Sequence, residues 1–112
     1  MAEQPIPTVS SADVDRVVRR DFSGQEATVL ALLKAYEDRE SHRVRLAVLK
    51  LAAGNTDQVR RLVDCAKRDY RDVISWAEYP AYAETAPRSL TETAAEQIIA
   101  ADWSQYQQWL LP

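Results

Sequence analysis

The sequence predicts an all-α fold, a compact bundle of about five helices, and three observations support this prediction. Apolar residues make up 46% of the chain and recur every three or four positions along several segments. Only two glycines occur, fewer than the turns of a β-sandwich or barrel usually need. Residues that cap helices precede most of the periodic segments. A length of 112 residues fits one domain, with residues 1–9 as a flexible or extended arm and residues 10–112 as a single helical domain.

The first two predicted helices begin at capping boxes, in which a serine and an acidic residue three positions later satisfy free amides. Ser10 and Asp13 open a short first helix. Ser23 and Glu26 open the second helix, which reaches Tyr36. Because apolar side chains cover a wide arc of this second helix, we expect it at the centre of the bundle.

The third and fourth predicted helices form the middle of the chain. The third begins after Ser41, is apolar around most of its circumference, and ends at Gly54, where a left-handed cap favours glycine. Asn55 and Thr56 can cap the fourth helix, the longest, which ends before Pro80 because a residue preceding proline avoids the helical conformation. Together the two helices have features of a HEAT-like helix pair, although one pair does not make a solenoid.

A loop is expected after Pro80, followed by a last helix from about Leu90 to Leu110 with a capping box at Ser89 and Glu92. Two interpretations of its broad apolar side stay open. The side chains either complete the core or form a surface for a partner or a homodimer. The large residues in question are Trp103, Tyr106, Trp109 and Leu110.

Charge and composition argue against several function classes. The net charge is −3, with 14 basic and 17 acidic residues, so nothing attracts nucleic acid or anionic lipid in bulk. No apolar run approaches the roughly 18 residues of a membrane span, and the N-terminus lacks the pattern of a signal peptide. Cys65 is the single cysteine, cannot form an internal disulfide, and is expected in the core. We expect a cytoplasmic protein that contacts neither nucleic acid nor membrane.

Catalysis and metal binding receive little support from the sequence. His42 is the only histidine, and with Asp38 it makes just two ligands at helical spacing, too few for a metal site. The chain has no glycine-rich phosphate loop, no GxSxG elbow and no HExxH motif. We therefore expect no metal and no cofactor.

The segment DYRDVISWAEYPAY, residues 69–82, is the strongest candidate for a functional site. On a helix, Asp69, Asp72 and Trp76 share one side and the apolar residues share another. The aromatic residues could fold over the helix end and shield the core, or they could form a binding surface, since Trp, Tyr and Arg are enriched at interface hot spots. The candidate binding residues are Asp69, Arg71, Asp72, Trp76, Glu78, Tyr79 and Tyr82.

Two functions follow from this segment. The first is a protein-interaction or regulatory accessory module with no catalytic activity of its own and an unknown protein partner. The alternative is a small enzyme or ligand-binding domain that uses acidic and basic side chains beside an aromatic wall. Those side chains are Asp69, Arg71, Asp72 and Glu78.

Three segments also occur in the order found in a known group of proteins. They are the DFS turn at residues 21–23, the RVRLAVLKLA helix at residues 43–52 and the DYRDVISWAEYPAY segment. Over residues 20–82 the chain resembles an uncharacterised family of small bacterial helical proteins that carry a DYRDVxxWAEYPxY segment. The resemblance implies a bacterial origin and an all-helical fold, and it transfers no catalytic residue.

Overall fold

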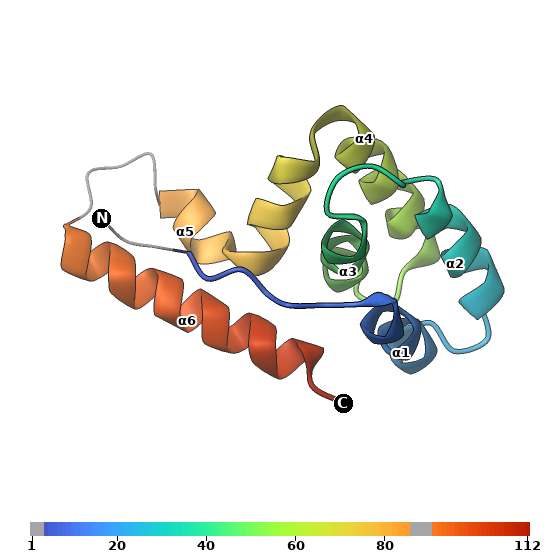
Figure 1. Ribbon diagram of the computed structural model, residues 1–112, viewed down its shortest axis with the longest axis horizontal. Helices are drawn as coiled ribbons and strands as arrows, with labels where there is room; N and C mark the ends of the chain where they lie inside the picture. Colours follow the sequence, from blue (N-terminus) through green and yellow to red (C-terminus); the bar gives the residue numbers. More distant parts are fainter. Residues whose placement is uncertain (1–3, 86–90) are drawn as a thin grey trace.

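A computed structural model describes residues 4–85 and 91–112, and within these ranges the protein is built from six α-helices (Figure 1). The described parts contain no strand, so the predicted all-α bundle is confirmed. The molecule measures 45 × 30 × 21 Å. The helices are α1 (Ser11–Asp21), α2 (Glu26–Lys34), α3 (Ser41–Ala52), α4 (Thr56–Glu78), α5 (Pro80–Thr85) and α6 (Glu92–Leu110).

The additional helix is α5, and the prediction of a plain loop after Pro80 was wrong. Pro80 does end α4, as expected, but it is also the first residue of α5. Proline suits the first position of a helix, because its fixed φ is helical and the N–H that it lacks would have no partner there. A six-residue helix shows no clear periodicity, which is why the sequence pattern did not reveal it.

The centre of the bundle is α3, and the central position predicted for the second helix was wrong. α3 packs most extensively on α4 and also contacts α1. Within α2 only Val29 and Leu33 are buried, whereas Leu30 and Leu32 are half-buried at the edge of the core. The buried residues of α3 are Val44, Leu46, Ala47, Val48, Leu49 and Ala52.

Several helix ends are as the sequence predicts. The amide of Ser10 donates to the carboxylate of Asp13 at 3.0 Å, which supports the first capping box. The side chain of Asn55 accepts a hydrogen bond from a first-turn amide of α4 at 3.2 Å. α3 ends in a left-handed cap as expected, but the capping residue is Ala53, with φ 50°, and Gly54 follows it with φ +84°.

The second capping box was wrong, and the third falls partly outside the described residues. α2 begins at Glu26 with Gln25 in the capping position, so Ser23 is not its cap, and the carboxylate of Glu26 accepts instead from the amide of Gly24 at 2.9 Å. Ser89 lies outside the described residues. The first residue described there, Thr91, caps α6 through its side chain.

α4 is bent near its middle. Asp69 has non-helical backbone angles, φ −157° and ψ 99°, and its carboxylate accepts from the amide of Arg71 at 3.1 Å. An extended residue whose side chain satisfies an amide two residues later is how a helix normally begins. Residues 70–78 therefore form a second helical part, which we call the distal half of α4, and it leads to α5 (Figure 1).

The predicted N-terminal arm is extended over residues 4–9, and it is packed against the bundle. We call these residues the strap. It runs from the α5 end of the molecule to the start of α1 (Figure 1). Pro7 is buried, Val9 packs on the core, and the hydroxyl of Tyr79 donates to the carbonyl oxygen of Pro5.

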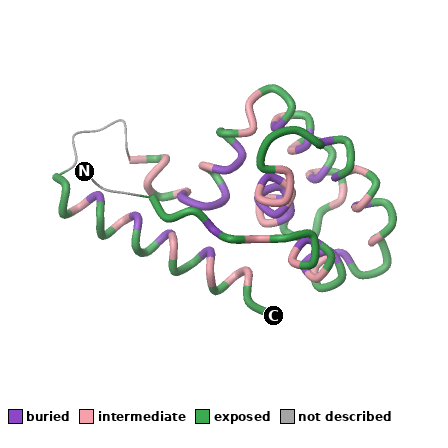
Figure 2. The backbone as a smooth tube through the Cα atoms, viewed as in Figure 1, coloured by how far each residue is buried: buried purple, intermediate pink, exposed green. Residues whose placement is uncertain are grey.

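α5 and α6 pack side by side at the other end of the bundle. Asp102 of α6 is only 6% exposed, and its carboxylate accepts from the amide of Tyr82 at 2.9 Å and from that of Ala81 at 3.4 Å. These are free amides of the first turn of α5, which have no partner inside so short a helix. A carboxylate on α6 thus stabilises the start of α5, and the buried positions of α6 lie along its inward side (Figure 2).

Candidate functional site

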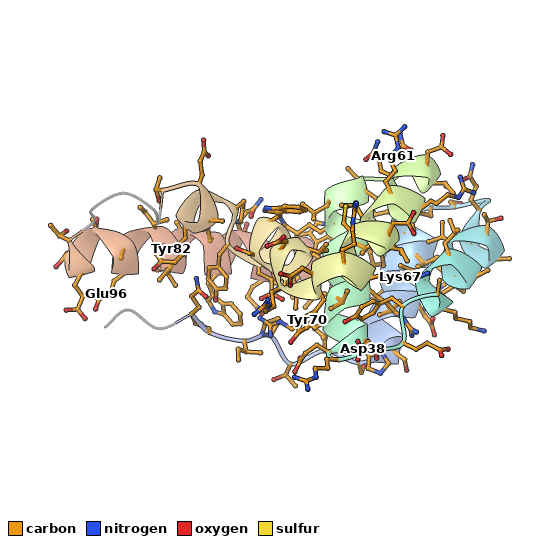
Figure 3. The ribbon with its side chains drawn as sticks, turned by 90° about the horizontal axis from the view of Figure 1, so that it is seen from above. Asp38, Arg61, Lys67, Tyr70, Tyr82 and Glu96 are labelled. Carbon is orange, nitrogen blue, oxygen red and sulfur yellow. The ribbon has the colours of Figure 1, made fainter. Side chains whose placement is uncertain are left out.

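The structure divides the DYRDVISWAEYPAY segment between the core and the surface. Glu78 and Tyr79 point inward and are 1% and 3% exposed. Tyr82 is half-buried in α5, and Figure 3 shows it beside α5 and α6, away from Tyr70. Of the remaining candidates, Arg71, Asp72 and Trp76 are exposed on the distal half of α4, and Asp69 is half-buried at the bend directly before it.

Glu78 belongs to a buried ion pair. Its two carboxylate oxygens accept from the Nη2 and Nε atoms of Arg43 at 2.7 and 2.8 Å, a two-point geometry that matches a carboxylate to a guanidinium. The hydrogen bonds to Glu78 raise the pKa of Arg43 above its usual range. The pair joins α3 to the distal half of α4. Because the carboxylate of Glu78 is bound to Arg43, it is not free to serve in the enzyme or ligand-binding site of the alternative function.

Two tyrosine hydroxyls lie inside the protein. Burial raises the pKa of Tyr79 to about 12, and its hydroxyl is bound to the strap. Tyr106 of α6 is fully buried, burial raises its pKa as well, and its hydroxyl has no partner among the described residues. Both residues therefore pack in the interior, and Tyr106 is not available on α6 as a partner surface.

Charged residues on the outer side of the distal half of α4 are solvated. The guanidinium of Arg71 lies 3.0 Å from the carboxylate of Asp69, and its side chain is 76% exposed. Hydrogen bonds from Arg71 lower the pKa of Asp69. An exposed pair of this kind adds little to stability, because water and salt screen it. Asp72 is exposed on the same outer side.

Trp76 is the feature that core packing does not explain. The residue is 46% exposed, whereas the other eight aromatic residues are buried or half-buried. A tryptophan buries 150–250 Å² when fully covered, so roughly 100 Å² of this ring system stays in water. At about 25 cal/mol per Å², covering that area would contribute about 2–3 kcal/mol. The protein leaves this apolar surface on its outside.

The C-terminal aromatic residues are mostly used inside the chain. The guanidinium of Arg20 lies 5.3 Å from the ring centre of Trp109, and its Nη1 donates to the carbonyl oxygen of the same residue at 2.7 Å. Trp109 also packs against Tyr106, with ring centres 5.6 Å apart. Leu110 is half-buried against the core and Trp103 is half-buried. The apolar side of α6 therefore packs largely on this chain.

The four polar residues of the alternative function do not meet in one site. Asp69 and Arg71 line an open pocket of about 320 Å³ at the bend of α4. Figure 3 shows Lys67 and Tyr70, which also line this pocket, close to the loop that carries Asp38. Glu78 does not line it, since its carboxylate is bound to Arg43 in the core.

Metal ligands are not gathered in the described residues: within them no three His, Cys, Asp or Glu side chains lie close enough together to hold an ion. Cys65 is half-buried against the core, and the guanidinium of Arg68 donates to its sulfur at 3.4 Å. His42 is half-buried at the start of α3.

Sequence reasoning missed the partners that come from distant parts of the chain. Arg43, Asp102 and Pro5 were not expected to contact the candidate segment, and nothing local indicates that they do. Glu78 carried a usable signal, because it follows Ile74 by four positions and therefore falls on the apolar side of the helix. A carboxylate on that side requires a buried partner.

Comparisons with known proteins give no family for the chain. No family model matches it, and neither a curated protein nor a solved structure is significantly similar to it. The resemblance to small bacterial helical proteins stays a prediction, as does the HEAT-like description of α3 and α4. Among the described helices, none is long and apolar enough to cross a membrane.

Proposed function

We propose that this protein is a protein-interaction module, an accessory or regulatory subunit that binds a protein partner through the outer side of the distal half of α4. The observation that carries the proposal is the exposed indole of Trp76. Tryptophan is among the residues most enriched at interface hot spots, where a partner covers the ring and excludes water.

The surroundings of Trp76 support this function. The distal half of α4 is held on its inner side by the Arg43–Glu78 pair, so the indole stands on a rigid element. A rigid anchor loses little conformational entropy on binding, and more of the contact energy is left for affinity. Arg71 and Asp72 are exposed on the same half-helix and can form the polar rim that surrounds an apolar contact.

The proposed setting is the bacterial cytoplasm. The basis is the family resemblance together with a single cysteine, Cys65, that has no second cysteine to pair with. In such a setting the partner is another protein, bound without a cofactor.

The test begins with a partner identified by a photo-reactive side chain placed at Asp72. The purified partner is then titrated against the wild type and against Trp76→Ala. We expect the dissociation constant to rise about 30-fold, as for a hot spot of about 2 kcal/mol, with Trp76→Phe in between. Arg60→Ala is the matched control, because Arg60 is exposed on the first half of the same helix and should leave affinity unchanged.

Two results would contradict the proposal. One is an identified partner that binds Trp76→Ala as tightly as the wild type. The other is a Trp76→Ala protein that unfolds under the conditions of the assay, which would make the indole a core residue.

A further inference from the structure

We propose that the strap exchanges between two copies of this chain, so that residues 4–9 of each copy dock on Tyr79 and on the start of α3 of the other. This inference goes beyond the proposed function, because it concerns a different surface and a different partner. The occupant is the strap of a second copy, since residues 4–9 are seen to fit this place beside Tyr79 and the start of α3.

The strap makes specific contacts at both of its ends. Near its start, the Tyr79 hydroxyl binds the carbonyl oxygen of Pro5. Toward its end, Pro7 is buried and Val9 packs on the core. Two pockets of about 310 Å³ adjoin it, one between Pro7–Val9 and the first residues of α3, the other between Gln4 and the distal half of α4. The strap thus contacts the helical bundle in the way that a separate bound peptide would, although it is part of the same chain.

Little holds the strap in place besides these contacts. In the described part of the chain, no backbone–backbone hydrogen bond involves residues 4–9, and Pro5 and Pro7 have no amide hydrogen to donate. Ile6 is 64% exposed and adds little burial. Release of the strap therefore breaks one described hydrogen bond and uncovers Pro7 and Val9, while every helix stays formed.

The connection to α1 allows the strap to move as one piece. Ser10 has extended backbone angles, φ −138° and ψ 176°, and is the capping residue directly before α1. Rotation near this residue leaves the capping hydrogen bond to Asp13 within the same chain. All the contacts of a docked strap can be made again on a second copy, in a closed two-fold pair.

Protein concentration decides between the two arrangements. A short tether gives the strap an effective local concentration in the millimolar range, so exchange grows as the protein approaches that concentration. The homodimer surface that the sequence suggests on α6 is different. Tyr106 and Trp109 of that helix pack inside their own chain.

The experiment uses cysteine pairs in a full-length Cys65→Ala background. Gln4 of the strap and Ser75 of α4 line the same pocket as Tyr79. Gln4→Cys and Ser75→Cys are introduced separately, the two proteins are mixed and oxidised, and disulfide-linked dimers are counted on a non-reducing gel. The Gln4→Cys/Ser75→Cys double variant reports docking within one chain. The matched control replaces Ser75→Cys by Asp57→Cys, an 82% exposed site on the first turn of α4.

We expect the mixture to give a Gln4→Cys–Ser75→Cys dimer at least about fivefold above the control pair at about 1 mM protein, with the excess falling on dilution. The inference is overturned if the double variant closes within one chain while the mixture gives no excess. It is also overturned if the double variant does not close, because the strap is then not docked. Adding Trp76→Ala should leave the cross-link unchanged, so the result is separate from that for the Trp76 surface.

Discussion

Trp76 and Glu78 are two residues apart on α4, and their side chains point to opposite sides of the helix and have different roles. Glu78 turns inward, where a buried carboxylate is stable only because Arg43 satisfies both of its oxygens. Trp76 turns outward, where no packing against this chain holds about half of its surface. The inward residue fixes the helix that displays the outward one.

Replacement of Glu78 by alanine should destabilise the protein strongly. The change leaves the half-buried guanidinium of Arg43 without a partner, which typically costs about 3–5 kcal/mol. Urea unfolding followed by circular dichroism measures the free energy of unfolding. Asp72→Ala, an exposed carboxylate on the same half-helix, is the control and should change it by less than about 0.5 kcal/mol. Equal stability of the two variants would show that the Arg43–Glu78 pair does not hold α4 to α3.

The buried phenol of Tyr79 should make stability fall at alkaline pH. Burial raises its folded pKa to about 12, above the ordinary value of 10, so the unfolded chain releases the proton first. The contribution of the protonated Tyr79 phenol to the free energy of unfolding is complete below about pH 10 and is lost as the pH rises toward 12. The free energy of unfolding, measured from pH 8 to 11.5, should decline less steeply in Tyr79→Phe than in the wild type. Identical slopes would mean that Tyr79 titrates as if exposed.

At the scale of elements, the turn between α3 and α4 depends on glycine at one position. Gly54 has φ +84°, and a Cβ there would lie 3.3 Å from the carbonyl oxygen of Asp21 at the end of α1. Gly24 has a similar φ of +87°, but a Cβ there would meet nothing within 4 Å. The two glycines therefore separate backbone strain from crowding.

Gly54→Ala should be more destabilising than Gly24→Ala. Strain from the positive φ costs both variants about 1 kcal/mol, and crowding against α1 should add a further ~1 kcal/mol at Gly54 alone. Thermal and urea unfolding of the two proteins measure the difference. If both lose the same stability, the turn after α3 has room to move away from Asp21.

Helix ends that depend on neighbouring residues could be predicted from the sequence. Elements that are stabilised by residues far away in the chain could not. The cap at Asn55 and the end of α4 before Pro80 depend on neighbouring residues alone, and both were predicted correctly. The bend at Asp69 was missed, although an acidic residue two positions before the amide that it caps has the chemistry of a helix start. α5 depends on Asp102, twenty and twenty-one positions away in the chain, and no local pattern shows it.

For the candidate site, too, the sequence predicted the position of some residues correctly and that of others incorrectly. Sequence spacing placed Trp76 on the same side of the helix as Asp72, away from the apolar residues, and in the structure both are exposed. The same reasoning grouped Glu78 with the surface charges, whereas its partner Arg43 lies thirty-five positions earlier on α3. A single sequence shows periodicity along a helix, but not which residue of another helix faces it.

At the scale of the whole molecule, three connections join the two ends of the bundle. The Arg43–Glu78 pair links α3 to the distal half of α4, Arg20 of α1 binds the end of α6, and the strap runs between the α5 end and α1 (Figure 1). The Arg43–Glu78 pair, which does not depend on the strap, holds the distal half of α4 on α3 and leaves its outer side in solvent. The proposed binding surface therefore requires no rearrangement to meet a partner.

The central claim is that Trp76 stands in solvent on a folded, rigid helix, and acrylamide quenching of its fluorescence tests this most directly. Trp103→Phe and Trp109→Phe together leave Trp76 as the only tryptophan. Because the residue is 46% exposed, the Stern–Volmer constant of the folded protein should be about half of that in urea. A constant near one-tenth of the unfolded value would mean that the indole is covered, and the proposed interaction surface would then be absent.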